Sequence, residues 1–410
     1  MSTGVEASRR ATAPTSPGRV GDVRRRNLSL ILHQLGLSGQ TTRARLAADT
    51  GLTKASVSSL VADLVSAGLV MEVGLNRAAE RGRPGLGVAL NTAAAALGLE
   101  INVDYMAAGV LNLAGDLQFH QVVEQHNAGK DPEEVLGRLT ELAGQALQQA
   151  EAAGLTVHAG GLAVPGLVDT ASGRVLNAPN IGWRNVDIAE WAASLVPEGI
   201  LGTAVFNEAN SAALAELWYG HGRGMGNYLF ISGEVGIGGG IIIDSGLFAG
   251  PGGNAGEIGH IVVDPEGPEC SCGGSGCLER YAGQDAVFVR AGIEGGNDAE
   301  RMAALLEALE DGDEQALAAV RRAGHYLGVA ASSTFRLLDI DAAVLGGNFA
   351  TLERWITPAF HASVEEHAPA VLAADDVVVS GLGRQAALMG AAGSRIRTVI
   401  EHPHLLLKQH

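Results

Sequence analysis

Hydrophobic residues near the N-terminus recur every three or four positions, as on one face of a helix. The apolar residues that predict a first helix are Leu28, Leu30, Ile31, Leu32 and Leu35. A second helix is predicted over 41–48, with Leu46 and Ala47 turned inward. The residues that predict a third, over about 54–67, are Val57, Leu60, Val61 and Leu64. Three short amphipathic helices in succession indicate a small helical domain.

The turn between the second and third helices has the residues that such turns require. Gly51 suits the left-handed position that ends a helix, and Thr53 suits the N-cap of the next one. Gly68 ends the third helix, and LVMEV and GVAL then predict two short strands. The loop between these strands contains the arginines Arg77, Arg81 and Arg83. Residues 23–93 are therefore predicted to form a winged helix-turn-helix domain.

Recognition helices present their N-terminal residues to base edges in the major groove. The candidate DNA-contacting residues at this end of the third helix are Thr53, Lys54, Ser56, Ser58 and Ser59. Arg81 and Arg83 of the wing would contact phosphates or the minor groove. Double-stranded operator DNA is the predicted partner, although serines discriminate bases too weakly to indicate its sequence. A small helical domain for protein interaction is the alternative.

From residue 94 onward, strands with glycine turns alternate with helices. ALGLEINVDYMAAGVLNLAGD predicts two strands joined by a turn, and DPEEVLGRLTELAGQALQQAEAAG predicts a helix. Such alternation indicates an α/β fold, and two lobes with a cleft between them would fit the length. We expect this domain to span 94–400, between a disordered tail at 1–22 and a C-terminal tail at 401–410.

Charge separates the two predicted domains. Residues 1–93 contain 12 Lys and Arg against 6 Asp and Glu, whereas the remainder contains 16 against 39, within a net charge of −17 for the chain. A basic module on an acidic body favours nucleic-acid binding at one end only. No apolar run has the length of a membrane span, and the N-terminus has no apolar signal-peptide segment. We therefore expect a cytoplasmic, nucleoid-associated protein without a membrane partner.

All three cysteines of the chain lie within eight residues. His260, Cys270, Cys272 and Cys277 give the spacing H-x9-C-x-C-x4-C. Three thiolates and one imidazole are a complete tetrahedral zinc set of the structural type. Free buried cysteines would be scattered instead, and a redox pair normally has the spacing C-x-x-C. The spacing predicts one structural Zn²⁺ ion within residues 260–277.

Several motifs occur in an order that resembles the ROK family of repressors and sugar kinases. They are VPGLVD, NAPNIGW, NEANSAALAE, GEVGIGGGI, GNAGEIGH and CSCGGSGCLE. Together with the winged helix, the chain resembles a ROK transcriptional repressor of the xylose-repressor type over about residues 25–395. The resemblance implies a two-lobed, sugar-kinase-like body with the actin-like ATPase, ribonuclease H-like fold.

The resemblance also implies a set of sugar-binding residues. They are Asn180, Asn207, Glu208, Glu257, His260 and Glu279. Carboxylates and amides accept and donate hydrogen bonds in fixed directions, as recognition of vicinal hydroxyls requires. His260 could hold zinc through one ring nitrogen and a sugar hydroxyl through the other. The implied partner is a monosaccharide, and the polar set does not distinguish xylose, glucose and N-acetylglucosamine.

The phosphate-binding motifs of the related kinases are altered. Where those kinases have D-x-G-G-T/S, this chain has Glu100-Ile101-Asn102-Val103-Asp104, and Glu234 replaces a hydroxyl residue in the second loop. Phosphate loops work by offering N–H groups and space to an anion, which acidic side chains oppose. Glu208 stands where the kinases have a catalytic aspartate, and a displacement of about 1 Å can cost about 100-fold in rate.

These features predict a sugar-responsive transcriptional repressor without enzymatic activity. A homodimer, or a dimer of dimers, would place two winged helices on a pseudo-palindromic operator. The alternatives are an active ROK sugar kinase with an appended DNA-binding domain and a repressor controlled by a protein partner. Activation of transcription in place of repression also stays open.

Overall fold

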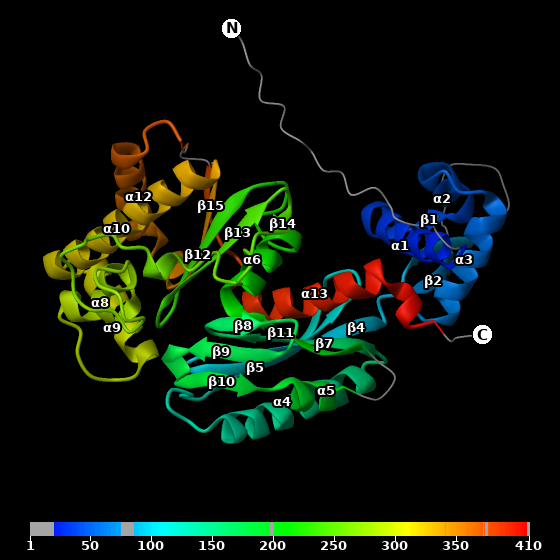
Figure 1. Ribbon diagram of the computed structural model, residues 1–410, viewed down its shortest axis with the longest axis horizontal. Helices are drawn as coiled ribbons and strands as arrows, with labels where there is room; N and C mark the ends of the chain where they lie inside the picture. The colour runs from blue at the N-terminus through cyan, green and yellow to red at the C-terminus, as the bar shows by residue number, and fades with distance from the viewer. Residues whose placement is uncertain are drawn as a thin grey trace, which may run out of the picture. The chain divides into compact units, whose positions relative to one another are not determined.

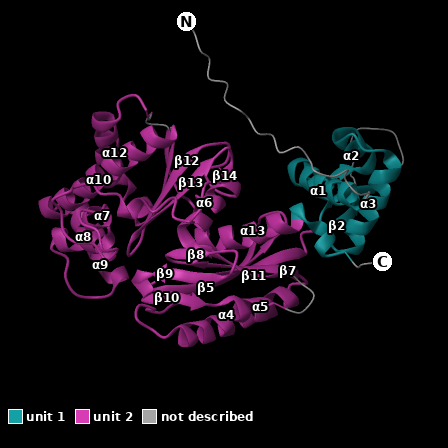
Figure 2. Ribbon diagram, in the orientation of Figure 1, with its two compact units in different colours: residues 1–90, 400–410 teal, residues 91–399 magenta. Residues whose placement is uncertain are grey.

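The computed structural model describes residues 20–74, 86–196, 201–340, 342–371, 373 and 376–407. It divides into two compact units, residues 1–90 with 400–410 and residues 91–399 (Figure 2). None of the described helices is both long and apolar enough to cross a membrane.

The N-terminal unit contains the predicted helix-turn-helix and strands. Its elements are α1 (Val20–Ser38), β1 (Thr41–Thr42), α2 (Arg43–Thr50), α3 (Lys54–Ser66), β2 (Val70–Gly74) and β3 (Leu86–Leu90). β3 pairs antiparallel with both β1 and β2. Gly51 ends α2 at φ 70°, and the Thr53 hydroxyl caps α3 by accepting from the Ser56 amide at 3.1 Å. These two cap predictions are confirmed.

One apolar face of α1 packs into the core of this unit. Leu28, Ile31, Leu32 and Leu35 are all buried. Leu30 is 38 % exposed, so its expected place on the buried face is wrong. The reason is angular, because positions 28, 31, 32 and 35 follow the helical repeat, whereas position 30 points away from them. The wing arginines Arg77, Arg81 and Arg83 lie outside the described residues.

The two chain ends enter the structure differently from the tails that we expect. α1 begins at Val20, within the range 1–22, while residues before it lie outside the described residues. At the other end, η5 (Pro403–Leu405) packs against α1 as part of the N-terminal unit, with Pro403 buried. The C-terminal segment 401–407 is therefore built into the helical domain.

The larger unit has two α/β lobes, each with a five-stranded sheet (Figure 1). The first sheet has the order β11-β7-β4-β5-β6, with β4, β7 and β11 parallel. The helices and strands of this lobe are β4 (Ala94–Ile101), β5 (Tyr105–Asn112), β6 (Leu117–Glu124), α4 (Pro132–Ala152), β7 (Thr156–Val164), β8 (Leu167–Asp169), β9 (Arg174–Ala178), η1 (Pro179–Ile181), β10 (Trp183–Asp187), α5 (Ala189–Ser194) and β11 (Leu201–Asn207).

The second lobe is built on the sheet β14-β13-β12-β15-β16. Its elements are α6 (Glu208–Trp218), β12 (Tyr228–Gly233), β13 (Ile237–Ile243), β14 (Gly246–Leu247), η2 (Ile258–His260), α7 (Glu279–Ala282), α8 (Gln284–Ala291), α9 (Asp298–Glu310), α10 (Glu314–Leu338), β15 (Ala343–Gly347), α11 (Asn348–Thr351), α12 (Glu353–His367), β16 (Val377–Val379) and η4 (Gly383–Gln385). The predicted two-lobed α/β body is confirmed.

The helices α6 and α13 (Ala386–Glu401) join the lobes. α6 contacts strands of both sheets. α13 lies against the first sheet, and Figure 1 shows it in red beside β7 and β11. A Cβ added at Gly161 of β7 would stand 2.2 Å from the Ala391 carbonyl oxygen of α13. Only glycine permits this close approach of α13 to β7.

Candidate functional site

A cavity of about 370 Å³ lies between the two lobes of the larger unit. All six of the expected sugar-binding residues line it: Asn180, Asn207, Glu208, Glu257, His260 and Glu279. They come from η1, β11, α6, the loop before η2, η2 and α7. Elements separated by about a hundred residues in sequence thus direct carboxylate, amide and imidazole groups into one space, as recognition of a polyhydroxyl ligand requires.

Local structure fixes the orientation of the first-lobe side of the cavity. The Asn207 side chain caps α6 by accepting from the Asn210 amide at 2.8 Å, and its Nδ2 donates to the Gly166 carbonyl at 2.8 Å. One hydrogen and one lone pair of this amide remain for a ligand. Gly166 itself has φ 83°, and a Cβ there would meet the Asn177 carbonyl at 2.3 Å.

The second-lobe side of the cavity is held by Glu279 and Gly236. Glu279 Oε2 accepts from the Ile237 amide at 3.2 Å. A Cβ at Gly236 would stand 2.4 Å from this oxygen and 2.8 Å from Asn180 Nδ2. Gly236 therefore gives the two polar side chains room to face the same space.

Glu257 and His260 form a pair on the rim of this cavity. His260 Nε2 lies 3.9 Å from Glu257 Oε2, and the Glu257 side chain is 41 % exposed. Burial raises the pKa of Glu257, His260 opposes this shift, and the charge of Glu279 adds to it. The opposite ring nitrogen, His260 Nδ1, lies 3.8 Å from Cys270 Sγ. The imidazole therefore has one nitrogen toward the cysteines and the other toward the glutamate.

The four residues of the cysteine motif form a cluster that could hold a metal ion. Their ligand atoms all lie within 4.8 Å of one another, and Cys272 Sγ is 3.6 Å from Cys277 Sγ. Tetrahedral ligands on Zn–S bonds of about 2.3 Å stand about 3.7 Å apart, so the cluster fits a metal of that size. Gly276 makes the tight turn possible, because a Cβ there would be 1.7 Å from the Asp264 carbonyl oxygen.

Four further polar residues line the cavity in addition to the six predicted ones. They are Asn102, Asn177, Glu234 and Asn254. Asn177 and Asn254 belong to NAPNIGW and GNAGEIGH, so these two motifs contain the sequence signal for them. Asn102 and Glu234 stand in the two stretches that the sequence analysis compares with the phosphate-binding motifs of the kinases.

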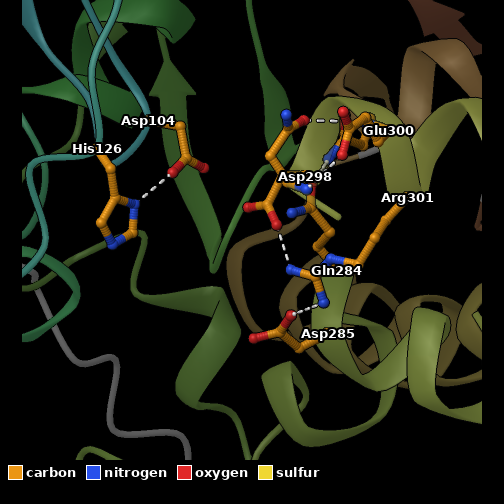
Figure 3. Close-up of polar contacts among 9 residues, drawn as sticks. Asp104, His126, Gln284, Asp285, Asp298, Glu300 and Arg301 are labelled. Carbon is orange, nitrogen blue, oxygen red and sulfur yellow. Dashed lines mark hydrogen bonds and ion pairs between the residues drawn. The ribbon is translucent and has the colours of Figure 1, made fainter. Parts of the chain in front are cut away.

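Asp104 does not line this cavity, in contrast to its expected place beside a phosphate. Its Oδ1 lies 2.8 Å from His126 Nδ1, as Figure 3 shows. Burial and the neighbouring Asp298 raise the pKa of Asp104. Asp298 in turn accepts from Arg301, which also donates to Asp285 at 2.9 Å (Figure 3). The turn after β4 directs this carboxylate toward Asp298 of the other lobe, so the expected place of Asp104 beside a phosphate is wrong.

The described DNA-contact candidates lie at the start of α3. Thr53, Lys54, Ser58 and Ser59 are exposed, and Ser56 is half-buried. Ser56 Oγ lies 2.9 Å from Thr53 Oγ1, so these two hydroxyls serve the cap. Several arginines of this unit pair with acids: Arg24 with Asp63, Arg43 with Glu72, and Arg45 with Asp49. Lys54 is exposed at the first position of α3.

The family follows from comparison with known proteins. Residues 96–394 match the model of the ROK family. The chain belongs to the ROK family. The xylose repressor of Bacillus subtilis is 26 % identical over 381 residues, which cover 93 % of this chain and 96 % of the repressor.

Two solved structures extend this comparison. A ROK family transcriptional regulator, described as a homolog of the E. coli MLC protein, aligns with a TM-score of 0.77 and 26 % identity over 94 % of this chain and 98 % of its own. A ROK family glucokinase from Streptomyces griseus, in complex with glucose and AMPPNP, aligns with a TM-score of 0.62 and 28 % identity. It covers 73 % of this chain and 98 % of its own. The regulator alignment thus covers a larger share of the chain, and both alignments support the actin-like fold of the body.

Proposed function

We propose that this protein is a sugar-responsive transcriptional repressor that binds operator DNA through α3 and the wing. The observation that carries the proposal is the cavity in which all six hydroxyl-binding candidates meet, in the same chain as a winged helix-turn-helix. The repressor relatives that span both parts support it. A monosaccharide that binds one lobe arrangement more tightly would shift the protein toward it and release the operator.

Xylose is the first effector to test, because several relatives, among them those of Caldicellulosiruptor bescii and Bacillus subtilis, are named xylose repressors. The carboxylates Glu257 and Glu279 would accept hydrogen bonds from sugar hydroxyls, and Asn180 would both donate and accept. In a symmetric dimer, two recognition helices would reach successive half-sites of the operator.

Zinc is the metal that fits the cysteine cluster best, since three thiolates and an imidazole are its preferred structural ligands. Bound there, it would supply rigidity to residues 260–277 and leave no open position for a catalytic water. His260 would present its Nε2 to the sugar while Nδ1 is held on the cysteine side. Sugar affinity and metal occupancy would then depend on each other.

A kinase is the alternative function, because ROK glucokinases share the body fold. Against it, Asn102 and Glu234 line the cavity. The resemblance to the kinases implies glycine and a hydroxyl residue at these two positions. Phosphoryl transfer relies on positioning and on electrostatic stabilisation of the phosphates, and a carboxylate opposes the second. The cavity is accordingly proposed to bind sugar without phosphorylating it.

The test measures DNA binding, sugar binding and ATP turnover on one preparation. A duplex selected from a random-sequence pool by the purified chain is titrated in fluorescence anisotropy, with and without xylose, glucose or N-acetylglucosamine. The effective sugar should release the duplex and bind saturably in calorimetry without ATP. ATP turnover with a sugar at about 1–100 per second, as in kinases, would establish the alternative.

Glu257→Gln is the variant that ties the release to the cavity. Replacing a charged hydrogen-bond acceptor by a neutral one costs about 1–1.5 kcal/mol, so sugar affinity should fall about tenfold. Operator affinity without sugar should be unchanged. The exposed Glu151→Gln, on the last turn of α4, is the matched control. Equal sugar affinity in both variants would contradict the assignment of Glu257 to the sugar site. No binding of any of the three sugars by wild type would favour a protein effector instead.

A further inference from the structure

The cysteines lie on a narrow loop that is closed at its base by backbone hydrogen bonds. The loop between Asp264 and Gly276 carries Cys270 and Cys272 and leads directly into Cys277. At the base of the loop, the Asp264 amide donates to the Gly276 carbonyl at 3.3 Å. The groups that fix this base therefore also fix how closely the cysteines approach one another.

The Asp264 side chain joins the base of this loop to α7. Its Oδ1 accepts from the Glu266 amide at 3.2 Å, and its backbone carbonyl accepts from the Gly267 amide at 2.9 Å, so the residue holds its own turn. Its Oδ2 accepts from the Tyr281 hydroxyl at 2.7 Å. Because Tyr281 belongs to α7, this hydrogen bond ties the loop to an element outside it.

Packing against α10 holds the Tyr281 ring in place. The ring centres of Tyr281 and Tyr326 lie 4.2 Å apart, and Tyr281 is 8 % exposed. The Arg322 guanidinium lies 4.8 Å from the centre of the Tyr326 ring and 5.3 Å from that of Tyr281. Aromatic pairs and cation–π contacts each contribute about 0.5–1.5 kcal/mol. The hydroxyl that meets Asp264 is thus presented from a fixed ring.

The single helical turn of α7 serves two places at once. Glu279 and Tyr281 are two positions apart, so their side chains leave the helix in nearly opposite directions. Glu279 lines the large cavity, whereas Tyr281 meets the cysteine loop and α10. The loop also fits closely against this ring, because a Cβ at Gly267 would stand 2.2 Å from the Tyr281 hydroxyl oxygen.

We propose that Tyr281 is a positioning residue for the metal cluster. Its hydroxyl, acting through the Asp264 carboxylate, keeps the loop closed, so that Cys270 and Cys272 stay within reach of a metal held by His260. Cys272 is the exposed member of the cluster and gains most from a fixed loop. Changing groups that orient metal ligands costs about 10–100-fold in metal affinity. The inference rests on the proposed zinc site and not on the identity of the sugar.

The experiment measures how fast zinc leaves the full, reduced chain, with the chromogenic chelator 4-(2-pyridylazo)resorcinol as acceptor. Tyr281→Phe removes the hydroxyl and keeps the ring that stacks on Tyr326. It should release zinc about tenfold faster than wild type, the lower end of the effect of groups that orient metal ligands. Tyr326→Phe, which removes the hydroxyl of the neighbouring ring, is the matched control and should release zinc at the wild-type rate.

A double-mutant cycle separates action through Asp264 from a general packing role of Tyr281. Asp264→Ala should speed zinc release at least as much as Tyr281→Phe, and adding Tyr281→Phe to it should have no further effect. Additive effects in the double variant, or equal release rates in wild type and Tyr281→Phe, would overturn this inference and leave the zinc site standing. A reduced wild type that holds no zinc would overturn the zinc assignment and this inference together.

Discussion

Replacing Glu100 by glutamine is expected to change how the stability of the protein depends on pH. Glu100 is buried in β4, and its pKa in the folded protein is about 8 instead of 4.5. Between these values the folded protein keeps a proton that the unfolded chain releases. Because the unfolded state then binds fewer protons, the free energy of unfolding decreases as pH rises through this window.

The magnitude follows from the width of the window. Each pH unit costs about 1.4 kcal/mol, so the full loss between pH 4.5 and 8 is about 5 kcal/mol. At pH 7.5 about 4 kcal/mol of it has developed, and at pH 5 less than about 1 kcal/mol. Glutamine has nearly the same shape, still accepts from Tyr105 and does not titrate. The variant should therefore be more stable than wild type by up to about 4 kcal/mol at pH 7.5 and nearly equal at pH 5.

Urea unfolding followed by tryptophan fluorescence, in metal-free buffer at half-unit steps from pH 5 to 8.5, measures this difference. The exposed Glu294→Gln should follow the wild-type profile. Parallel profiles for wild type and Glu100→Gln would refute the reasoning, because they would show that Glu100 binds its proton equally in the folded and unfolded states.

Three further outcomes are expected. Cys272→Ser should lower both the zinc content measured by mass spectrometry and the melting temperature, because metal binding contributes folding free energy. Reduced wild-type protein that contains no zinc would contradict this expectation. Ser271→Ala is the control variant. Lys54→Ala should weaken operator binding and reduce the salt slope by about one while sugar affinity stays constant; an unchanged slope would exclude a phosphate contact. Removal of residues 402–410 exposes the surface of α1 that is covered by the segment of buried Pro403. The truncated protein should bind the operator more weakly and keep its sugar affinity. Full operator binding would show that this packing is dispensable.

The sequence by itself determined the features that depend on near neighbours. The helix-turn-helix is visible from the spacing of Leu46, Val57 and Leu64 and from the caps at Gly51 and Thr53, because helical periodicity and capping are set by residues a few positions apart. The cysteine cluster is equally local, since its four side chains lie within eighteen residues of one another. Leu30 shows the limit, because an apolar residue next to the buried positions still points to solvent.

Only the tertiary structure decided which distant residues meet. Asn180, Glu208 and Glu279 lie far apart along the chain. Before the structure, only the resemblance to the ROK family, which rests on the order of the motifs, indicated that they share a site. The carboxylates of Glu100 and Glu234 also come together only in the fold, although both stand in stretches that match phosphate-binding motifs of the kinases. Asp104, a few residues from Glu100, faces His126 instead. Strand pairing and the packing of α6 and α13 between the lobes set these positions, and such long-range contacts leave no periodic trace in the chain.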